Sequence, residues 1–216
     1  MMMNLFSTFD PCTGNLSLNW MSTLIMMFLL NYNYWILPSN TVNLILKVYI
    51  TTKKELSVIM PQKGSTIMFI STSLFILTNN IMGLIPYIFT SSSHLSFSLA
   101  LALPMWMSFM IYGWINKTNS MFTHLLPMGT PPALMPFMVL IETISTLIRP
   151  GSLAVRLTSN MIAGHLLMAL LGSSCNITTT VMLMIIFMTL MLFETAVSFI
   201  QSYVFMILST LYSSEI

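Results

Sequence analysis

Two apolar stretches near the C-terminus constrain the fold of this chain more than any other feature. They run from about residue 133 to 172 and from about 178 to 211. As helices they would be roughly 60 and 50 Å long, whereas the hydrocarbon core of a membrane is about 30 Å thick. Ordinary helix tilts, which average about 20°, do not absorb such an excess.

Two arrangements resolve this mismatch in length. Either the first stretch breaks at Arg149-Pro150-Gly151 into two normal spans, or both stretches form steeply tilted helices. The second stretch contains neither proline nor glycine, so it has no residue at which a helix readily breaks. We therefore expect a long, strongly tilted helical hairpin, kinked near Pro150 and turning between residues 172 and 180.

The composition defines the class of protein. Only 6% of the 216 residues are charged, whereas soluble domains contain about 25%. The predicted fold class is an all-α integral membrane protein, with about four conventional or surface helices before the hairpin and one multi-span membrane domain over residues 1–216. A net charge of +2 does not indicate a nucleic-acid partner. The two cysteines lack metal-ligand spacing, and we expect neither a metal nor a cofactor.

The first half of the chain divides into four segments. We expect a first span over residues 16–37, spans over 64–89 and 95–115, and a segment over 39–63 that holds four of the seven basic residues. That segment is predicted to form an amphipathic surface helix or, alternatively, a solvated basic loop. The helix is indicated by the spacing of Val42, Ile45, Leu46, Tyr49 and Ile50. Lysine-rich loops stay on the inner side of a membrane, so the N-terminus is expected on the outer side.

The N-terminus and the methionine content bear on where the chain is made. The N-terminus has neither the pattern of a signal peptide nor that of an arginine-rich transit helix. The 23 methionines either replace leucine and isoleucine as core filler or reflect a mitochondrial genome, where an additional codon specifies methionine. Together these features favour synthesis inside the mitochondrion.

Polar residues also lie in and near the predicted middle spans. Asn79 and Asn80 interrupt apolar sequence, and such amides either hold helices together or line a wet path. His94 falls in a short outer loop, where we expect a solvated interfacial residue.

The ionisable residues of the hairpin follow the helical period. Glu142, Arg149 and Arg156 are seven residues apart, so each is offset by only about 20° around a straight helix. His165 follows Arg156 by nine residues, which is about 180° around the helix and about 14 Å along it. Arg156 and His165 are therefore expected to face opposite ways.

These groups either neutralise one another or serve proton transport. An arginine in mid-membrane costs from about 3 to more than 10 kcal/mol, so Arg156 is expected to have a use for its charge. Antiparallel pairing of His165 with Glu194, and of Arg156 with Gln201, would in both cases centre near residue 179, close to the predicted turn. His165 with Glu194 has the composition of a proton relay. For Glu142 both alternatives stay open.

Residues 153–167 read Leu-Ala-Val-Arg-Leu-Thr-Ser-Asn-Met-Ile-Ala-Gly-His-Leu-Leu. This segment closely resembles the signature of the subunit a family of mitochondrial F-type ATP synthases. Residues 4–11, 79–90, 141–145 and 193–205 extend the resemblance over nearly the whole chain. Ser159, where small apolar residues are common in the family, is a mild departure.

The resemblance implies a role for each polar residue of the hairpin. The chain would be the proton-translocating stator subunit of the Fo sector, with its hairpin against a rotating ring of c subunits and two offset proton half-channels. Arg156 would face the ring, with Asn160 and Gln201 as polar neighbours. His165 and Glu194 would form the half-channel open to the intermembrane space. Glu142 would belong to the matrix half-channel.

The resemblance also implies partners and a location. The partners would be the c-ring subunits, other Fo and peripheral-stalk subunits, the lipid bilayer and the translocated protons. The chain would be a multi-pass protein of the mitochondrial inner membrane with its N-terminus facing the intermembrane space.

Two other functions agree less well with the sequence. A self-contained proton or ion transporter should contain an internal repeat, and the sequence has none. A purely structural membrane subunit would have no need for Arg156. The chain lacks a Gly-x-x-x-x-Gly-Lys phosphate loop, so it would belong to an enzyme complex without carrying the nucleotide catalytic site.

Overall fold

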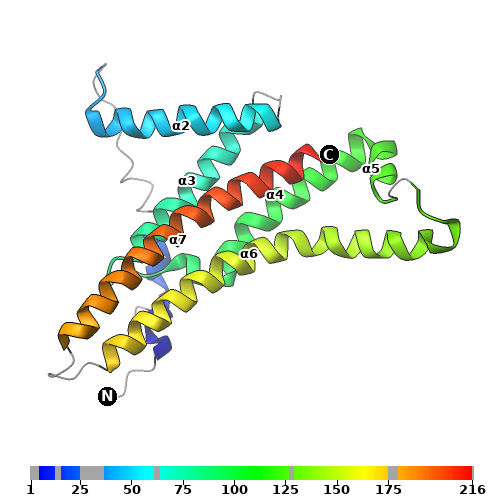
Figure 1. The fold of residues 1–216 in the computed structure, drawn as a ribbon. Helices are drawn as coiled ribbons and strands as arrows, with labels where there is room; N and C mark the ends of the chain where they lie inside the picture. Colours follow the sequence, from blue (N-terminus) through cyan, green and yellow to red (C-terminus); the bar gives the residue numbers. More distant parts are fainter. Residues whose placement is uncertain are drawn as a thin grey trace.

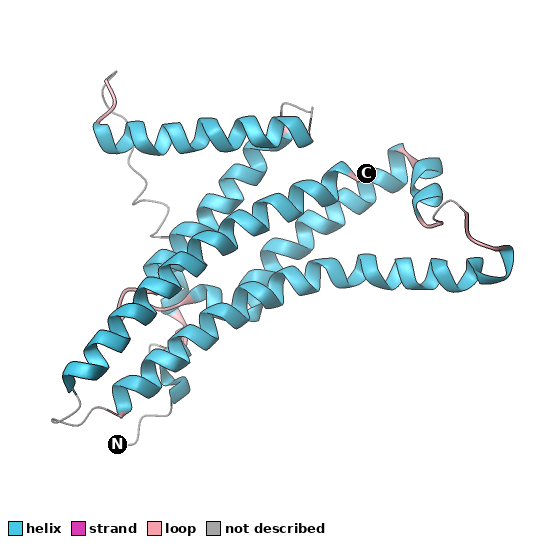
Figure 2. Ribbon diagram, in the orientation of Figure 1, coloured by secondary structure: helices cyan, strands magenta, loops and turns pink. Residues whose placement is uncertain are grey.

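The computed structural model describes residues 5–12, 16–24, 37–60, 64–126, 129–174 and 180–215. Those ranges contain α-helices and short 3-10 helices but no strand (Figure 2), which confirms the predicted all-α class. Four of the described helices are long and apolar enough to cross a membrane. They are α3 (Ser65–Gly83), α4 (Leu95–Asn116), α6 (Met135–Ser173) with the 3-10 turn before it, and α7 (Thr180–Ser214). Most of the predicted first span, residues 16–37, lies outside the described residues; its described start contains the 3-10 helix Leu18–Met21.

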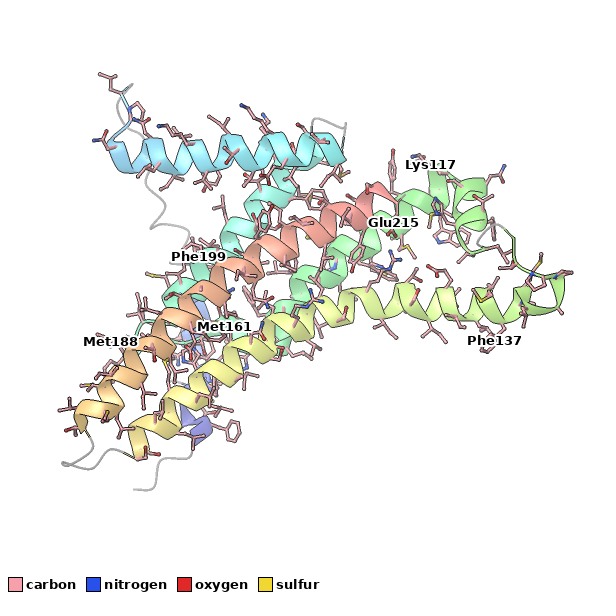
Figure 3. The ribbon with its side chains drawn as sticks, viewed as in Figure 1. Lys117, Phe137, Met161, Met188, Phe199 and Glu215 are labelled. Atoms are coloured by element: carbon pink, nitrogen blue, oxygen red, sulfur yellow. The ribbon has the colours of Figure 1, made fainter. Side chains whose placement is uncertain are left out.

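The hairpin is formed by α6, of 39 residues, and α7, of 35 residues. The helix α6 continues through Pro150, so it does not break there into two spans. Figure 1 shows α6 bending near the middle of its length, where Pro150 lies. Proline lacks the N–H that would close the helical hydrogen bond and crowds the preceding turn, which accounts for a bend. The N-terminal part of α6 extends away from the other helices, and Phe137 there is 62% exposed (Figure 3).

Helix α2 (Asn40–Ile59) occupies most of the lysine-rich segment and lies across the end of α3 (Figure 1). The helical alternative is therefore correct for this segment. Ile45 and Ile50 of the predicted apolar side are not covered by the chain, while Leu56 and Met60 are buried against α3 and α7. The hydroxyl of Tyr203 on α7 also donates to Glu55 on α2, at 3.1 Å.

One helix boundary and one additional helix differ from the sequence prediction. Helix α3 ends at Gly83, earlier than the predicted residue 89, because Pro86 disfavours helical backbone at the residue before it. The chain then turns through Tyr87, which has a positive φ of 69°. A short helix that was not predicted, α5 (Thr118–His124), follows α4.

The core lies where α3, α4, α6 and α7 meet. It contains the buried apolar side chains Ile76, Ala102, Leu153, Ala154, Leu157 and Phe205. Several serines are buried beside it, and those of α4 and α7 donate to the carbonyl three residues earlier in their own helix. Their small size and internal hydrogen bonds let the helices approach closely without leaving these hydroxyls unpaired.

Candidate functional site

One side of α6 is not covered by the rest of the chain. Its exposed residues recur every three or four positions and therefore form a single stripe, the uncovered α6 face, made of Ser152, Val155, Arg156, Ser159, Ala163, Leu167 and Leu170. The neighbouring Leu157 and Thr158 are buried in the bundle. The backbone oxygen of Arg156 accepts a hydrogen bond from the Ser159 hydroxyl, but within the described ranges its guanidinium makes no hydrogen bond or ion pair. An arginine in that state within a membrane requires a partner beyond the described residues.

Glu194 lies in a groove between α6 and α7. The groove has a volume of about 350 Å³, and Asn160 and Gln201 also line it. Ala163 and Leu167 belong both to the groove lining and to the uncovered α6 face. Three of the predicted site residues, Asn160, Glu194 and Gln201, thus share one cavity that adjoins the face carrying Arg156.

Gly164 allows Glu194 to lie directly against α6. A Cβ atom added at Gly164 would be 2.7 Å from both Cδ and Oε1 of Glu194, closer than any ordinary contact between such atoms. Glycine is therefore required for this placement of the carboxyl group. The position also defines the register of the hairpin, since Gly164, rather than the predicted His165, lies against Glu194.

His165 lines a second cavity, the vestibule. The vestibule has a volume of about 810 Å³ and is lined by the N-terminal segment, the loop after α3, and parts of α6 and α7. The ring of Phe9 meets the His165 ring edge to face, with 6.1 Å between the centroids. Leu84, which is buried, lines both the vestibule and the groove and so lies between them.

No hydrogen bond joins His165 to Glu194. Among the described side chains, Nε2 of His165 and both carboxyl oxygens of Glu194 are buried without any hydrogen-bond partner. Leaving such groups unpaired in an apolar setting is costly, and a structure that keeps them usually has a use for them. Both side chains can bind and release protons. His165 lines the vestibule, and Glu194 lies in the groove against the adjacent Gly164.

The charged groups at the other end of the hairpin are paired. Arg149 contacts the carboxylates of Glu215 and Glu142, the latter at 3.8 Å, and its guanidinium lies 5.1 Å from the centre of the Tyr212 ring. Glu142, Arg149 and Glu215 line a cavity of about 430 Å³, to which α4 and α5 contribute Trp106 and His124. Glu142 thus forms an ion pair with Arg149 and also lines this cavity.

The contact of Glu215 with Arg149 was not predicted from the sequence; Glu215 follows the end of α7 (Figure 3). The register of the hairpin predicts the contact of Glu215 with this region. If Glu194 lies against Gly164, each step toward the C-terminus on α7 corresponds to a step back along α6. Glu215 is then brought to the region of residues 142–149, where Arg149 needs an anion.

His94 was expected to be solvated, and this expectation is wrong. Its Nε2 atom makes a 2.9 Å hydrogen bond with the backbone oxygen of Phe9, and its ring stacks on Phe89 and contacts Trp20. No pattern in the sequence indicates a contact between these residues, which are 85 positions apart.

The asparagine pair of α3 is buried. Asn79 donates to the carbonyl of Phe75 at 2.9 Å, within its own helix. Asn80 is fully buried, and its amide has no partner among the described residues. Asn80 thus holds no described helix by a hydrogen bond.

Comparison with known proteins decides the family. The family described as ATP synthase A chain matches residues 2–214. The chain belongs to this family. It is 55% identical to ATP synthase subunit a of Anopheles quadrimaculatus over 225 residues and 56% identical to that of Locusta migratoria over 224 residues, with complete coverage of both chains in each case.

Membership of the ATP synthase A chain family confirms the resemblance found in the sequence. The predicted function as a proton-translocating Fo subunit is confirmed with it. The insect relatives and the four apolar helices agree with a multi-pass protein of the mitochondrial inner membrane.

Proposed function

We propose that the uncovered α6 face docks against the ring of c subunits and that Arg156 faces the ring carboxylates. The observation that supports this proposal is the exposed Arg156, whose guanidinium has no partner in the described chain. Its neighbours on the same face are Ser159 and Ala163. Small residues let a second helix approach closely in a membrane, where packing replaces the hydrophobic effect as the source of association.

Arginine is suited to this position because it stays protonated. A fixed positive charge holds a passing ring carboxylate in its deprotonated form and blocks a direct leak between the half-channels. A lysine could lose its proton in such a setting. Each proton that crosses releases about 2.3 kcal/mol per 100 mV of membrane potential, and only offset half-channels can convert this into rotation.

The proton path on the outer side starts in the vestibule at His165. It passes to Glu194 at the Gly164 contact, and then along the groove beside Asn160 and Gln201 to the ring. The unpaired nitrogen of His165 and the unpaired oxygens of Glu194 support this path, because hydrogen-bonded water would satisfy both. On the other side, the cavity at Glu142 belongs to the matrix half-channel.

The orientation follows from the lysines of α2. In Figure 1, α2 and the N-terminal segment lie at opposite ends of the bundle. Lysine-rich segments remain on the inner side, so α2 faces the matrix and the N-terminus faces the intermembrane space. Other Fo and peripheral-stalk subunits complete the set of partners.

Cross-linking of two adjacent positions tests the docking proposal. In a complex without the native cysteines, Ser159→Cys lies on the uncovered α6 face, whereas Thr158→Cys lies in the bundle. With a cysteine placed on the outer ring helix beside its carboxylate, we expect oxidation to link Ser159→Cys to a c subunit and to stop rotation. Thr158→Cys should remain unlinked. Equal linking of both positions, or of neither, would contradict the proposal.

A further inference from the structure

The N-terminal segment, residues 5–12, is attached to the vestibule wall through the backbone carbonyls of two consecutive residues, Phe9 and Asp10. His94 binds the oxygen of Phe9 at 2.9 Å, and the side-chain amide of Asn19 donates to the oxygen of Asp10 at 3.4 Å. The Phe9 ring rests on His165. Figure 1 shows this segment, in dark blue, beside the C-terminal half of α6. The segment is therefore part of the vestibule wall.

Asp10 is the acidic residue that this attachment brings to the vestibule. It is exposed and lines the same cavity as His165. Of the five acidic residues of the chain, Glu55, Glu142 and Glu215 belong to other regions and Glu194 lies in the groove. Asp10 makes no ion pair with a described residue.

Among the described residues, the other titratable groups of the vestibule lining are Cys12, Tyr87 and His165, and neither a lysine nor an arginine belongs to it. His94 contacts the segment from behind Phe9. Asp10 is therefore the only carboxylate among the described residues of this lining.

We infer that Asp10 collects protons at the mouth of the vestibule and supplies them to His165. This inference rests on the proposed outer half-channel. It adds Asp10 and the N-terminal segment as the part that forms the opening of that half-channel. A carboxylate at the opening of a low-dielectric cavity attracts cations and raises their local concentration. It also binds a proton reversibly and passes it to water and then to the imidazole. Asp10 is then a carboxylate again and can bind the next proton.

Proton supply can limit transport when the outer compartment is alkaline. At about pH 8 the free proton concentration is ~10⁻⁸ M, so capture at a ceiling of about 10¹⁰ M⁻¹s⁻¹ supplies only about 10² protons per second. Enzyme turnover of about 1–10³ per second needs a comparable supply. A collecting carboxylate therefore matters most at alkaline pH and least at acidic pH.

The test uses assembled ATP synthase in vesicles, with Asp10→Asn compared to the parent at constant proton-motive force. At alkaline pH on the outer side, we expect synthesis to fall by about two- to fivefold, and at acidic pH the two rates should converge. High salt should lower the parent rate toward the variant rate, because it screens the attraction. Asp10→Glu, which keeps the carboxylate, should behave like the parent.

The outcomes separate this inference from the proposed function. An equal loss at every pH, or no loss at any pH, would overturn the role of Asp10. Ser7→Ala, another change in the vestibule lining, serves as the matched control for effects on assembly. If Glu194→Gln stops proton uptake while Asp10→Asn has no effect, the inference alone fails. If Glu194→Gln has no effect either, the outer half-channel itself is wrongly placed.

Discussion

Two arginines on one helix, seven residues apart, have opposite surroundings. Arg149 is held by two carboxylates and an aromatic ring. Arg156 lies on an exposed face and has no partner within the described chain. Residues seven apart leave a helix in nearly the same direction, so the helical period alone does not explain the difference. The tertiary structure brings Glu215 to one of them and leaves the other open.

The contrast distinguishes ionisable side chains that are paired within the chain from ionisable side chains that have no partner there. An ion pair that forms within the chain contributes modestly to stability and needs nothing else. A charge or carboxyl group left unpaired in an apolar setting destabilises the isolated chain and is retained for its function. This contrast supports the proposed roles of Arg156, His165 and Glu194 in the functional site, and it indicates a structural role for Arg149.

The largest expected effect comes from Arg156→Ala. Removing one partner of a buried charge pair typically costs about 3–5 kcal/mol, and we expect proton-driven ATP synthesis to fall by about 10²–10³-fold while the complex still assembles. Passive proton conductance of the membrane should rise, because the barrier between half-channels is lost. Synthesis and conductance are measured on the same vesicles.

Arg149→Ala is the matched control for that variant. Its pair with Glu215 is partly exposed, with 27% and 51% of the two side chains accessible, and such pairs are worth about 0–1 kcal/mol. We expect slightly reduced thermal stability of the complex and little change in synthesis or conductance. Similar losses in both variants would remove the distinction between the two arginines.

A smaller effect is expected for Glu194→Gln. Glutamine keeps the size of the side chain but cannot exchange a proton, and positioned proton-transfer groups contribute about 10²–10⁴-fold in enzymes. We expect proton uptake to slow by at least about tenfold with little change in the yield of complex. If only the yield falls, Glu194 has a structural role, like Arg149.

The smallest of these effects concerns Gly164→Ala. Alanine favours a helix by about 0.5–1 kcal/mol over glycine, but its Cβ would displace the Glu194 carboxyl group. We expect an equally or more stable complex in which proton uptake falls severalfold. Gly172→Ala, at a position of α6 with no atom near the added Cβ, should leave uptake unchanged. Equal uptake in the two variants would show that the close contact with Glu194 is unimportant.

The sequence alone determined the parts of the molecule that depend on length and period. The length of the apolar stretches predicted the α6–α7 hairpin, and Pro150 predicted the bend. The nine-residue spacing predicted different surroundings for Arg156 and His165, and the structure places one on the exposed face and the other in the vestibule. The pairing centre near residue 179 came within one residue of the contact between Gly164 and Glu194.

Only the tertiary structure decided which groups are paired. The contacts of Arg149 with Glu215 and of His94 with Phe9 join residues 66 and 85 positions apart. Such contacts depend on how whole helices pack, which local periodicity does not encode. The division of His165 and Glu194 between two cavities has the same origin, because Leu84 reaches that point from the end of another helix. Local sequence determines the helix face on which a side chain lies, and packing between distant segments determines which residues contact that side chain.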